Sequence, residues 1–158
     1  MLPRTYDTQV CSVARTLERI GDRWTMLVIR DAFLGVRRFD DFQRDLGIAR
    51  NVLTDRLGRL VDEGILERHA YQERPERFEY RLTEKGIDLW PVLISLMKWG
   101  DRHSPADAGP PTLIVHRDCG GEIDAHFRCE RCGADVDARS ADAMPGPGSR
   151  RQWPTAVL

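Results

Sequence analysis

Four side chains near the C-terminus have the types and the spacing of a metal site. Two residues separate His116 from Cys119, and two separate Cys129 from Cys132. A glycine follows the second residue of each pair and lets the backbone turn tightly beneath the sulfur. Four nitrogen and sulfur ligands in two such pairs suit a tetrahedral zinc ion. Because the protein would fill all four positions, the zinc would be structural.

The segment between the two pairs is long enough for a small hairpin, so we expect a zinc-ribbon-like module over residues 113–140. His126 is a rival ligand to His116. A reduced, metal-free loop is an alternative, as is a disulfide of Cys129 or Cys132 that forms on oxidation.

The fourth cysteine, Cys11, stands apart, at the expected N-terminal edge of a helix. The helix dipole favours a thiolate there, and Arg15, one turn further on, adds positive charge. Cys11 is therefore a candidate redox-sensing residue. An isolated cysteine is more often a small buried side chain, here at the edge of a dimer, and both interpretations stay open.

Apolar residues at helical spacing predict four helices before residue 64, over 11–21, 22–35, 40–47 and 50–63. Asp22 is expected to cap the second and Asp40 the third, and Gly47 and Gly64 are expected to end the third and the fourth. The third and fourth helices, joined by a short turn, predict a helix-turn-helix.

The side-chain period then changes from about 3.6 to 2. Two short strands flank a polar loop around Pro75, so a β-hairpin is expected over residues 65–82. A β-hairpin directly after a helix-turn-helix is the winged helix-turn-helix arrangement. A further apolar helix over 83–103, kinked at Pro91, is interpreted as a dimerisation helix; packing on the first helix is the alternative.

These elements predict an α+β, mainly α, fold in four parts. A winged helix-turn-helix domain with its dimer helix occupies residues 1–104 and a Pro/Gly/Ala linker 105–112. The zinc-ribbon-like module follows at 113–140, and a Pro/Gly-rich tail at 141–158, in which Trp153 could dock.

Composition narrows the function classes only slightly. The 24 basic and 25 acidic side chains nearly cancel, so any DNA-binding face must come from how the charges are arranged. The sequence has no apolar run long enough for a membrane helix and no apolar signal core at its start. We therefore expect a cytoplasmic protein without a membrane partner.

The runs IGDRWT, RRFDDFQ, NVLTDRL and FEYRLTEKG, with Cys11 ahead of them, resemble the HxlR-type winged helix-turn-helix transcriptional regulators over about residues 11–103. The resemblance implies a homodimer that binds an operator in double-stranded DNA, and no catalysis. Some members of that family sense oxidants or electrophiles at the position of Cys11. One departure is Ala49, where a capping residue is usual before the recognition helix; alanine costs about 1 kcal/mol there relative to serine.

The polar face of the helix over 50–63 is the candidate DNA-reading surface. Arg50 and Asn51 lie at its N-terminus, where Arg can pair with guanine and Asn with adenine. Thr54 could contact a phosphate or a thymine methyl, and Arg59 the backbone. Asp55 is expected to pair with Arg59 at i+4.

Three further arginines complete the candidate interface. Arg38 could hold a phosphate, and Arg74 and Arg77 in the wing could lie along the minor groove or the backbone. Each arginine taken alone is more often a solvated surface charge. As a group, these arginines form a credible DNA-binding surface, because the helix-turn-helix and the wing are expected to place them on one side of the domain.

Two other functions remain as alternatives. A small-molecule or oxidant effector could act on the regulator, for instance an aromatic compound among Trp24, Phe33, Trp90 and Trp99, although such residues are more often plain core. A winged-helix adaptor that binds protein instead of DNA is the second. An enzyme is not expected, because no catalytic constellation can be placed in one pocket.

Overall fold

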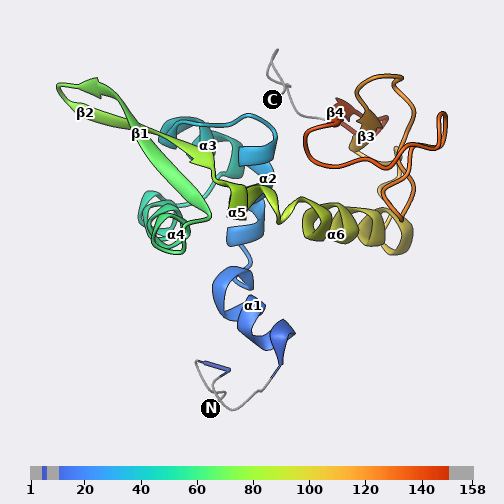
Figure 1. Ribbon diagram of the computed structural model, residues 1–158. Coiled ribbons are helices and arrows are strands. Elements are labelled where there is room, and N and C mark those ends of the chain that lie inside the picture. The colour runs from blue at the N-terminus through green and yellow to red at the C-terminus, as the bar shows by residue number, and fades with distance from the viewer. Residues whose placement is uncertain (1–4, 7–10, 150–158) are drawn as a thin grey trace. The chain divides into compact units, whose positions relative to one another are not determined.

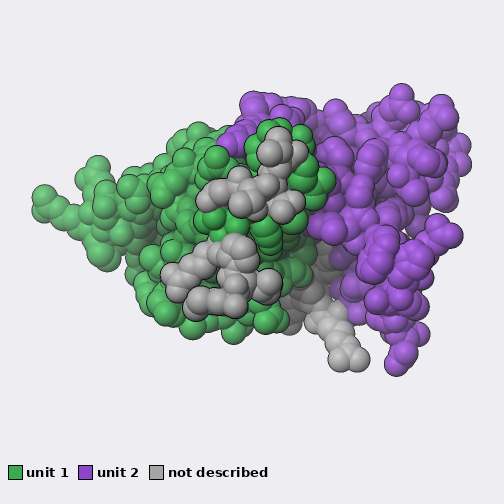
Figure 2. All heavy atoms as spheres, turned by 90° about the horizontal axis from the view of Figure 1, so that it is seen from below, with its two compact units in different colours: residues 1–32, 36–83 green, residues 33–35, 84–158 purple. Residues whose placement is uncertain are grey.

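The computed structural model describes residues 5–6 and 11–149. They fall into two compact units, which Figure 2 shows in different colours. Unit 1 comprises residues 1–32 and 36–83, and unit 2 comprises residues 33–35 and 84–158. The predicted docking of Trp153 lies outside the described residues.

Unit 1 is a winged helix-turn-helix, as predicted (Figure 1). Its elements in chain order are α1 (Ser12–Ile20), α2 (Thr25–Phe33), α3 (Phe39–Leu46), α4 (Arg50–Asp62), β1 (Leu66–Glu73) and β2 (Glu76–Leu82). The two strands pair in an antiparallel hairpin that forms the wing.

The core of unit 1 forms around the apolar faces of its helices. Leu53, Leu57 and Leu60 of α4 recur at i, i+4 and i+7 and are almost fully buried. Phe42 of α3 is also fully buried, as is Val28 of α2. Burial of these faces provides the main driving force for folding and confirms the predicted leucine face of α4.

Glycines end the two helices of the helix-turn-helix, and neither helix has a side-chain cap at its start. Gly47 follows α3 with a φ of 62°, in the left-handed region that glycine adopts without a steric penalty. Ala49 is the N-cap of α4 and makes no capping hydrogen bond, because a methyl side chain cannot accept one. The predicted cap of α3 by Asp40 is wrong. Arg38 is in the N-cap position because its extended backbone bridges to Glu79 of the wing, and the helix begins directly after it.

The wing is attached to the segment before α3 through its backbone. Tyr80 N donates to Arg37 O at 2.8 Å, next to the Arg38–Glu79 bridge. Within the hairpin, Arg68 pairs with Tyr80, and the register shifts between Ala70 and Gln72. These contacts hold the base of the wing beside the start of α3.

Unit 2 contains two helices and a small sheet. The helices are α5 (Glu84–Ile87) and α6 (Trp90–His103), and the antiparallel strands are β3 (Thr112–His116) and β4 (Ala141–Pro145). The tail predicted for 141–158 thus begins within β4, and α6 is grouped with the C-terminal segment. The four-part division of the chain stays a prediction. None of the helices in the described part of the chain is long and apolar enough to cross a membrane.

The predicted kink at Pro91 is wrong. Pro91 lies in the first turn of α6, after Leu89 at the N-cap, and the predicted helix over 83–103 is divided into α5 and α6. A backbone N–H in the first turn has no partner within the helix, so proline is tolerated there without loss of a hydrogen bond.

Candidate functional site

The outer face of α4 is polar and exposed at the helix N-terminus. Arg50, Asn51 and Thr54 are all exposed, on the side opposite the buried leucines. The Arg50 side chain is 71% exposed, lies 4.6 Å over the ring of Phe39 and approaches Asp40 to 3.8 Å. These contacts are weak at an exposed site. The guanidinium is therefore positioned near the start of α3 but is free to bind a partner.

The hydroxyl of Thr54 is already engaged. It donates to Arg50 O at 2.9 Å, so its oxygen can only accept a further hydrogen bond while its methyl group stays available. A base or phosphate oxygen, which can only accept, would have to displace this bond to take the hydroxyl proton.

The predicted pair between Asp55 and Arg59 is wrong. Asp55 instead contacts Arg56 at 2.8 Å, and Arg59 donates to Glu18 O at 3.4 Å. The reason is Arg56, whose Nε lies 2.9 Å from Asp22 Oδ1 in an ion pair and whose side chain is only 17% exposed. This anchor holds Arg56 beside Asp55 and gives Arg56 a structural role.

The arginines of the wing are exposed, and Arg38 is held beside them. Arg74 and Arg77 lie around the hairpin turn. The guanidinium of Arg38 lies 4.5 Å over the ring of Tyr71, and its Nε is 3.4 Å from Glu79 Oε1. Hydrogen bonds from Arg81, and then from Arg38, lower the pKa of Glu79 despite its partial desolvation. Glu79 therefore stays a carboxylate that orients Arg38.

A groove runs between the start of α3 and the wing. Its volume is about 640 Å³, and three of the candidate arginines, Arg38, Arg50 and Arg77, line it together with Tyr71 and Phe39. The two aromatic residues were not among the candidates predicted from the sequence. The sequence provided only a weak indication that they line a groove, because a single aromatic residue in a strand or at the start of a helix usually packs in the core. The other lining residues are Asp40, Asp41, Pro75, Glu76, Phe78 and Tyr80.

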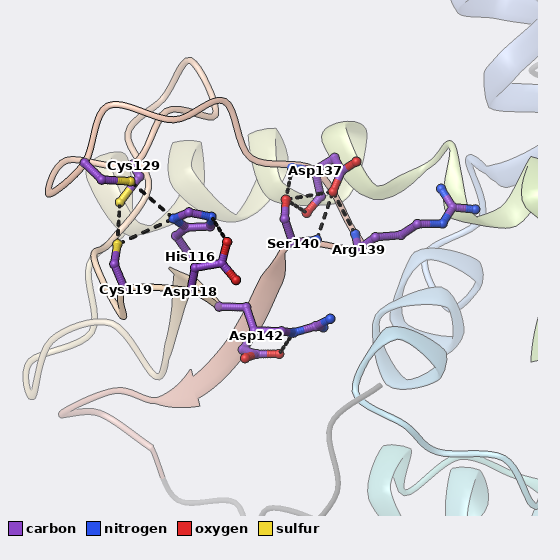
Figure 3. Close-up of polar contacts among 10 residues, drawn as sticks. His116, Asp118, Cys119, Cys129, Asp137, Arg139, Ser140 and Asp142 are labelled. Carbon is purple, nitrogen blue, oxygen red and sulfur yellow. Dashed lines mark hydrogen bonds and ion pairs between the residues drawn. The ribbon is translucent and has the colours of Figure 1, made fainter.

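The predicted metal ligands of unit 2 come together in one cluster (Figure 3). The Nδ1 or Nε2 of His116 and the Sγ atoms of Cys119, Cys129 and Cys132 all lie within 4.8 Å of one another. Nδ1 is 3.5 Å from Cys119 Sγ and 3.3 Å from Cys132 Sγ, and the sulfurs of Cys119 and Cys129 are 3.3 Å apart. Ligand atoms around a tetrahedral zinc are about 3.5–3.8 Å apart, so the donor set fits.

Two neighbours support this fit. A Cβ atom on Gly121 would come within 2.6 Å of Cys129 Sγ, so only glycine leaves room for that sulfur. Asp118 Oδ2 lies 3.5 Å from Nε2 of His116, on the side of the ring that faces away from the sulfurs. A carboxylate in this place is the usual outer partner of a metal-binding histidine. His126, the rival ligand, is exposed and does not belong to the cluster.

The backbone around the cluster sets the charge of two thiols. Burial raises the pKa of Cys129, but the amide groups of Cys132 and Arg131 outweigh it and bring the pKa down to about 6. At Cys119 the amide of Gly121 lowers the pKa, but the neighbouring sulfurs and partial burial outweigh it, and the net shift is upward. The contacts among the cluster's sulfur atoms thus shift the pKa of Cys119 upward and that of Cys129 downward.

Cys11 is the N-cap of α1, at the helix edge where the sequence placed it. Its side chain is exposed, and its Sγ accepts from Ala14 N at 3.3 Å. Arg15, expected to support a thiolate, donates instead to Ser12 Oγ at 3.0 Å. The helix N-terminus is thus the positive feature that Cys11 contacts.

Two contacts within unit 2 join the cluster region to the helices, and neither was predicted from the sequence. The rings of Trp90 in α6 and Phe127 lie 5.7 Å apart, and Arg139 pairs with Glu84 of α5 at 2.6 Å. Neither pair has a local sequence signal, because 37 and 55 positions separate the partners.

Comparison with known proteins identifies relatives of this chain. A family model described as HxlR-like helix-turn-helix matches residues 19–108. The uncharacterized HTH-type transcriptional regulator Rv3095 of Mycobacterium tuberculosis is 47% identical over 137 residues, which cover 87% of either chain. Since that match is longer than the stretch up to residue 108, the similarity continues into the C-terminal segment.

Two solved structures are similar as well. PA1607, a candidate transcription factor, is 39% identical with a TM-score of 0.67, over 83% of this chain and 92% of that chain. The redox regulator HypR in its oxidized form is 33% identical with a TM-score of 0.55, over 61% of this chain and 100% of that chain.

Proposed function

Because this chain belongs to the HxlR-like helix-turn-helix family of transcriptional regulators, which are not enzymes, we propose that it binds a specific double-stranded operator through α4 and the β1–β2 wing. The observation that carries the proposal is the division of α4 into a buried leucine face and an exposed polar face. A recognition helix needs both, one to fix its position and one to enter the major groove.

Each candidate residue takes a role that its position supports. Arg50 and Asn51, at the exposed N-terminus of α4, contact base edges. Thr54 offers its methyl group to a thymine, because its hydroxyl is bonded to Arg50 O. Arg38 and Arg59 contact the DNA backbone, and the wing arginines, Arg74 and Arg77, lie along the minor groove.

The regulator acts as a homodimer in this proposal. In α6, Val92, Leu96 and Trp99 follow one another at i, i+4 and i+7 and are 41%, 54% and 64% exposed. In α1, Val13 and Leu17 are 68% and 44% exposed. Single exposed apolar residues are ordinary, but a stripe along a helix indicates an interface. A two-fold dimer would match two operator half-sites.

The Cys/His cluster holds a structural zinc ion in a zinc-ribbon-like module. The closed set of four ligands and the carboxylate behind His116 support this assignment. Zinc content per chain tests it in the purified protein: Cys132→Ser should lose the metal, and His126→Ala should keep it. A wild-type protein that takes up no zinc when it is supplied would refute the assignment.

Cys11 remains the candidate for redox sensing within unit 1. Its exposure at the start of α1 supports this role, as does the similarity to HypR, a redox regulator. Peroxide treatment of the wild type and of Cys11→Ser, followed by operator binding, tests it. Equal responses of the two proteins would exclude Cys11 as the sensor.

Binding to duplex DNA from the gene's own upstream region tests the main proposal. We expect the native duplex to bind orders of magnitude more tightly than a scrambled one, with affinity falling steeply as salt rises. Arg50→Ala and Asn51→Ala should lose discrimination by roughly 5- to 150-fold, which corresponds to about 1–3 kcal/mol per base contact. Arg128→Ala, which removes the same charge from an exposed site in unit 2, is the matched control.

Two outcomes would count against the proposed recognition of the operator. Equal weak binding to both duplexes would contradict recognition of this operator. An absence of binding at low salt would favour the alternative of a winged-helix adaptor that binds protein, which a near-neutral chain also permits.

A further inference from the structure

The sulfur atoms of the Cys/His cluster lie close enough to react with one another. Cys119 Sγ is 3.3 Å from Cys129 Sγ. A disulfide bond is about 2.0 Å long, so the two atoms need to approach by only about 1.3 Å. No side-chain atom of Gly121 stands in the way of the Cys129 sulfur.

The two thiols differ in access. Cys119 is half-buried and within reach of a small oxidant, whereas Cys129 is 2% exposed. Cys132 is exposed as well, but its sulfur contacts His116 Nδ1 at 3.3 Å, whereas the sulfur that lies 3.3 Å from Cys129 Sγ is that of Cys119. This arrangement suits an accessible thiol that reacts first and a buried thiol that resolves the product.

We propose that the cluster is a peroxide-responsive switch, in which Cys119 and Cys129 form a disulfide and the metal leaves. The proposal rests on the zinc site proposed above. It adds a second oxidation site to the chain, independent of Cys11, and its oxidant class is a small hydroperoxide.

The chemistry balances with hydrogen peroxide as the oxidant. The Cys119 thiolate attacks one peroxide oxygen, the O–O bond breaks, and hydroxide leaves behind a sulfenic acid. The Cys129 thiolate then attacks that sulfur, the S–O bond breaks, and a second hydroxide leaves as the S–S bond forms. Two protons from solvent turn the hydroxides into water. The thiolates have given up two electrons and the peroxide has accepted them.

Loss of two thiolates removes half of the ligand set. His116 and Cys132 would remain, and two ligands do not make the four-coordinate site that structural zinc requires. Oxidation therefore couples disulfide formation to metal release, and reduction in the presence of zinc should reverse both.

The test uses the full-length, zinc-loaded Cys11→Ser variant, which leaves the cluster intact and removes the thiol of unit 1. Hydrogen peroxide is titrated while a colorimetric chelator reports free zinc and mass spectrometry maps disulfides. We expect one zinc released per chain, a mass lower by two hydrogens, and a crosslinked Cys119–Cys129 peptide. A dithiol reductant with added zinc should restore the starting state.

The opposing outcomes are distinct. Zinc that stays bound, with reduced thiols, at peroxide doses that oxidise a simple cysteine peptide would overturn the switch. A Cys129–Cys132 disulfide would overturn the assigned pair. If the protein takes up no zinc at all, the zinc proposal fails, and the coupling to metal release fails with it. Mapping the metal-free protein then decides whether Cys119 and Cys129 still pair.

Discussion

The ring of Trp90 lies 5.7 Å from the ring of Phe127, with the two planes inclined by 51°. Trp90 begins α6 and is buried, and Phe127 lies in the turn between the two pairs of cluster residues, His116/Cys119 and Cys129/Cys132. The start of the proposed dimer helix and the proposed metal module therefore share one aromatic contact within unit 2.

Removal of the Phe127 ring should loosen this contact. We expect Phe127→Ala to lower the free energy of unfolding by about 1–2 kcal/mol, because an aromatic pair and part of its buried area are lost. Urea denaturation measures the change, and a red shift of tryptophan emission should accompany it. Phe127→Leu, which keeps most of the bulk, should lose less. Equal stability of Phe127→Ala and the wild type would show that the contact contributes nothing.

Two glycines of the helix-turn-helix should respond to alanine in opposite directions. Gly47 ends α3 with a positive φ, and Gly58 lies within α4; neither has an atom within 4 Å of an added Cβ. Gly47→Ala should destabilise the protein by about 1–2 kcal/mol through backbone strain alone. Gly58→Ala should stabilise it by about 0.5–1 kcal/mol, because alanine favours the helix. Thermal denaturation compares the melting temperatures of the two variants with that of the wild type. Shifts of the same sign in both variants would contradict this account.

The wing should contribute affinity without sequence discrimination. Arg77→Ala is expected to weaken binding to native and scrambled duplexes to a similar degree and to reduce the salt slope by about 1, because it removes one positive charge that lies near the phosphates along the minor groove. Fluorescence anisotropy at several salt concentrations gives both quantities. A loss confined to the native duplex would instead place Arg77 on a base edge.

The apolar stripe of α6 should control the oligomeric state. Leu96→Glu places a charge in the middle of the stripe, where burial against a partner would be costly, and should convert the proposed dimer to a monomer. Analytical ultracentrifugation decides this. Lys98→Glu, which introduces the same side chain on another face of α6, is the control and should leave the dimer intact. A wild type that sediments as a monomer would refute the dimer itself.

Local patterns predicted most of the elements of unit 1. The leucine spacing of α4 and the glycines at 47 and 64 are confirmed, because each depends on a period or on backbone freedom that neighbouring residues set. The paired spacing of His116, Cys119, Cys129 and Cys132 likewise predicted which side chains would meet.

Features set by distant residues could not be predicted in this way. The backbone bridge to Glu79 makes Arg38, not Asp40, the N-cap of α3, and the ion pair with Asp22 turns Arg56 toward Asp55. Pro91 had a local alternative, a helix start, which its missing N–H permits as readily as a kink.

By itself, then, the sequence determined the winged helix-turn-helix, the α4 face and the membership of the Cys/His cluster, because periodicity and spacing carry that information. Only the tertiary structure decided how the start of α3 meets the wing, where Arg38 packs on Tyr71, and how Phe127 meets Trp90. Those contacts join residues more than 30 positions apart, and chain folding, rather than any local preference, brings them together.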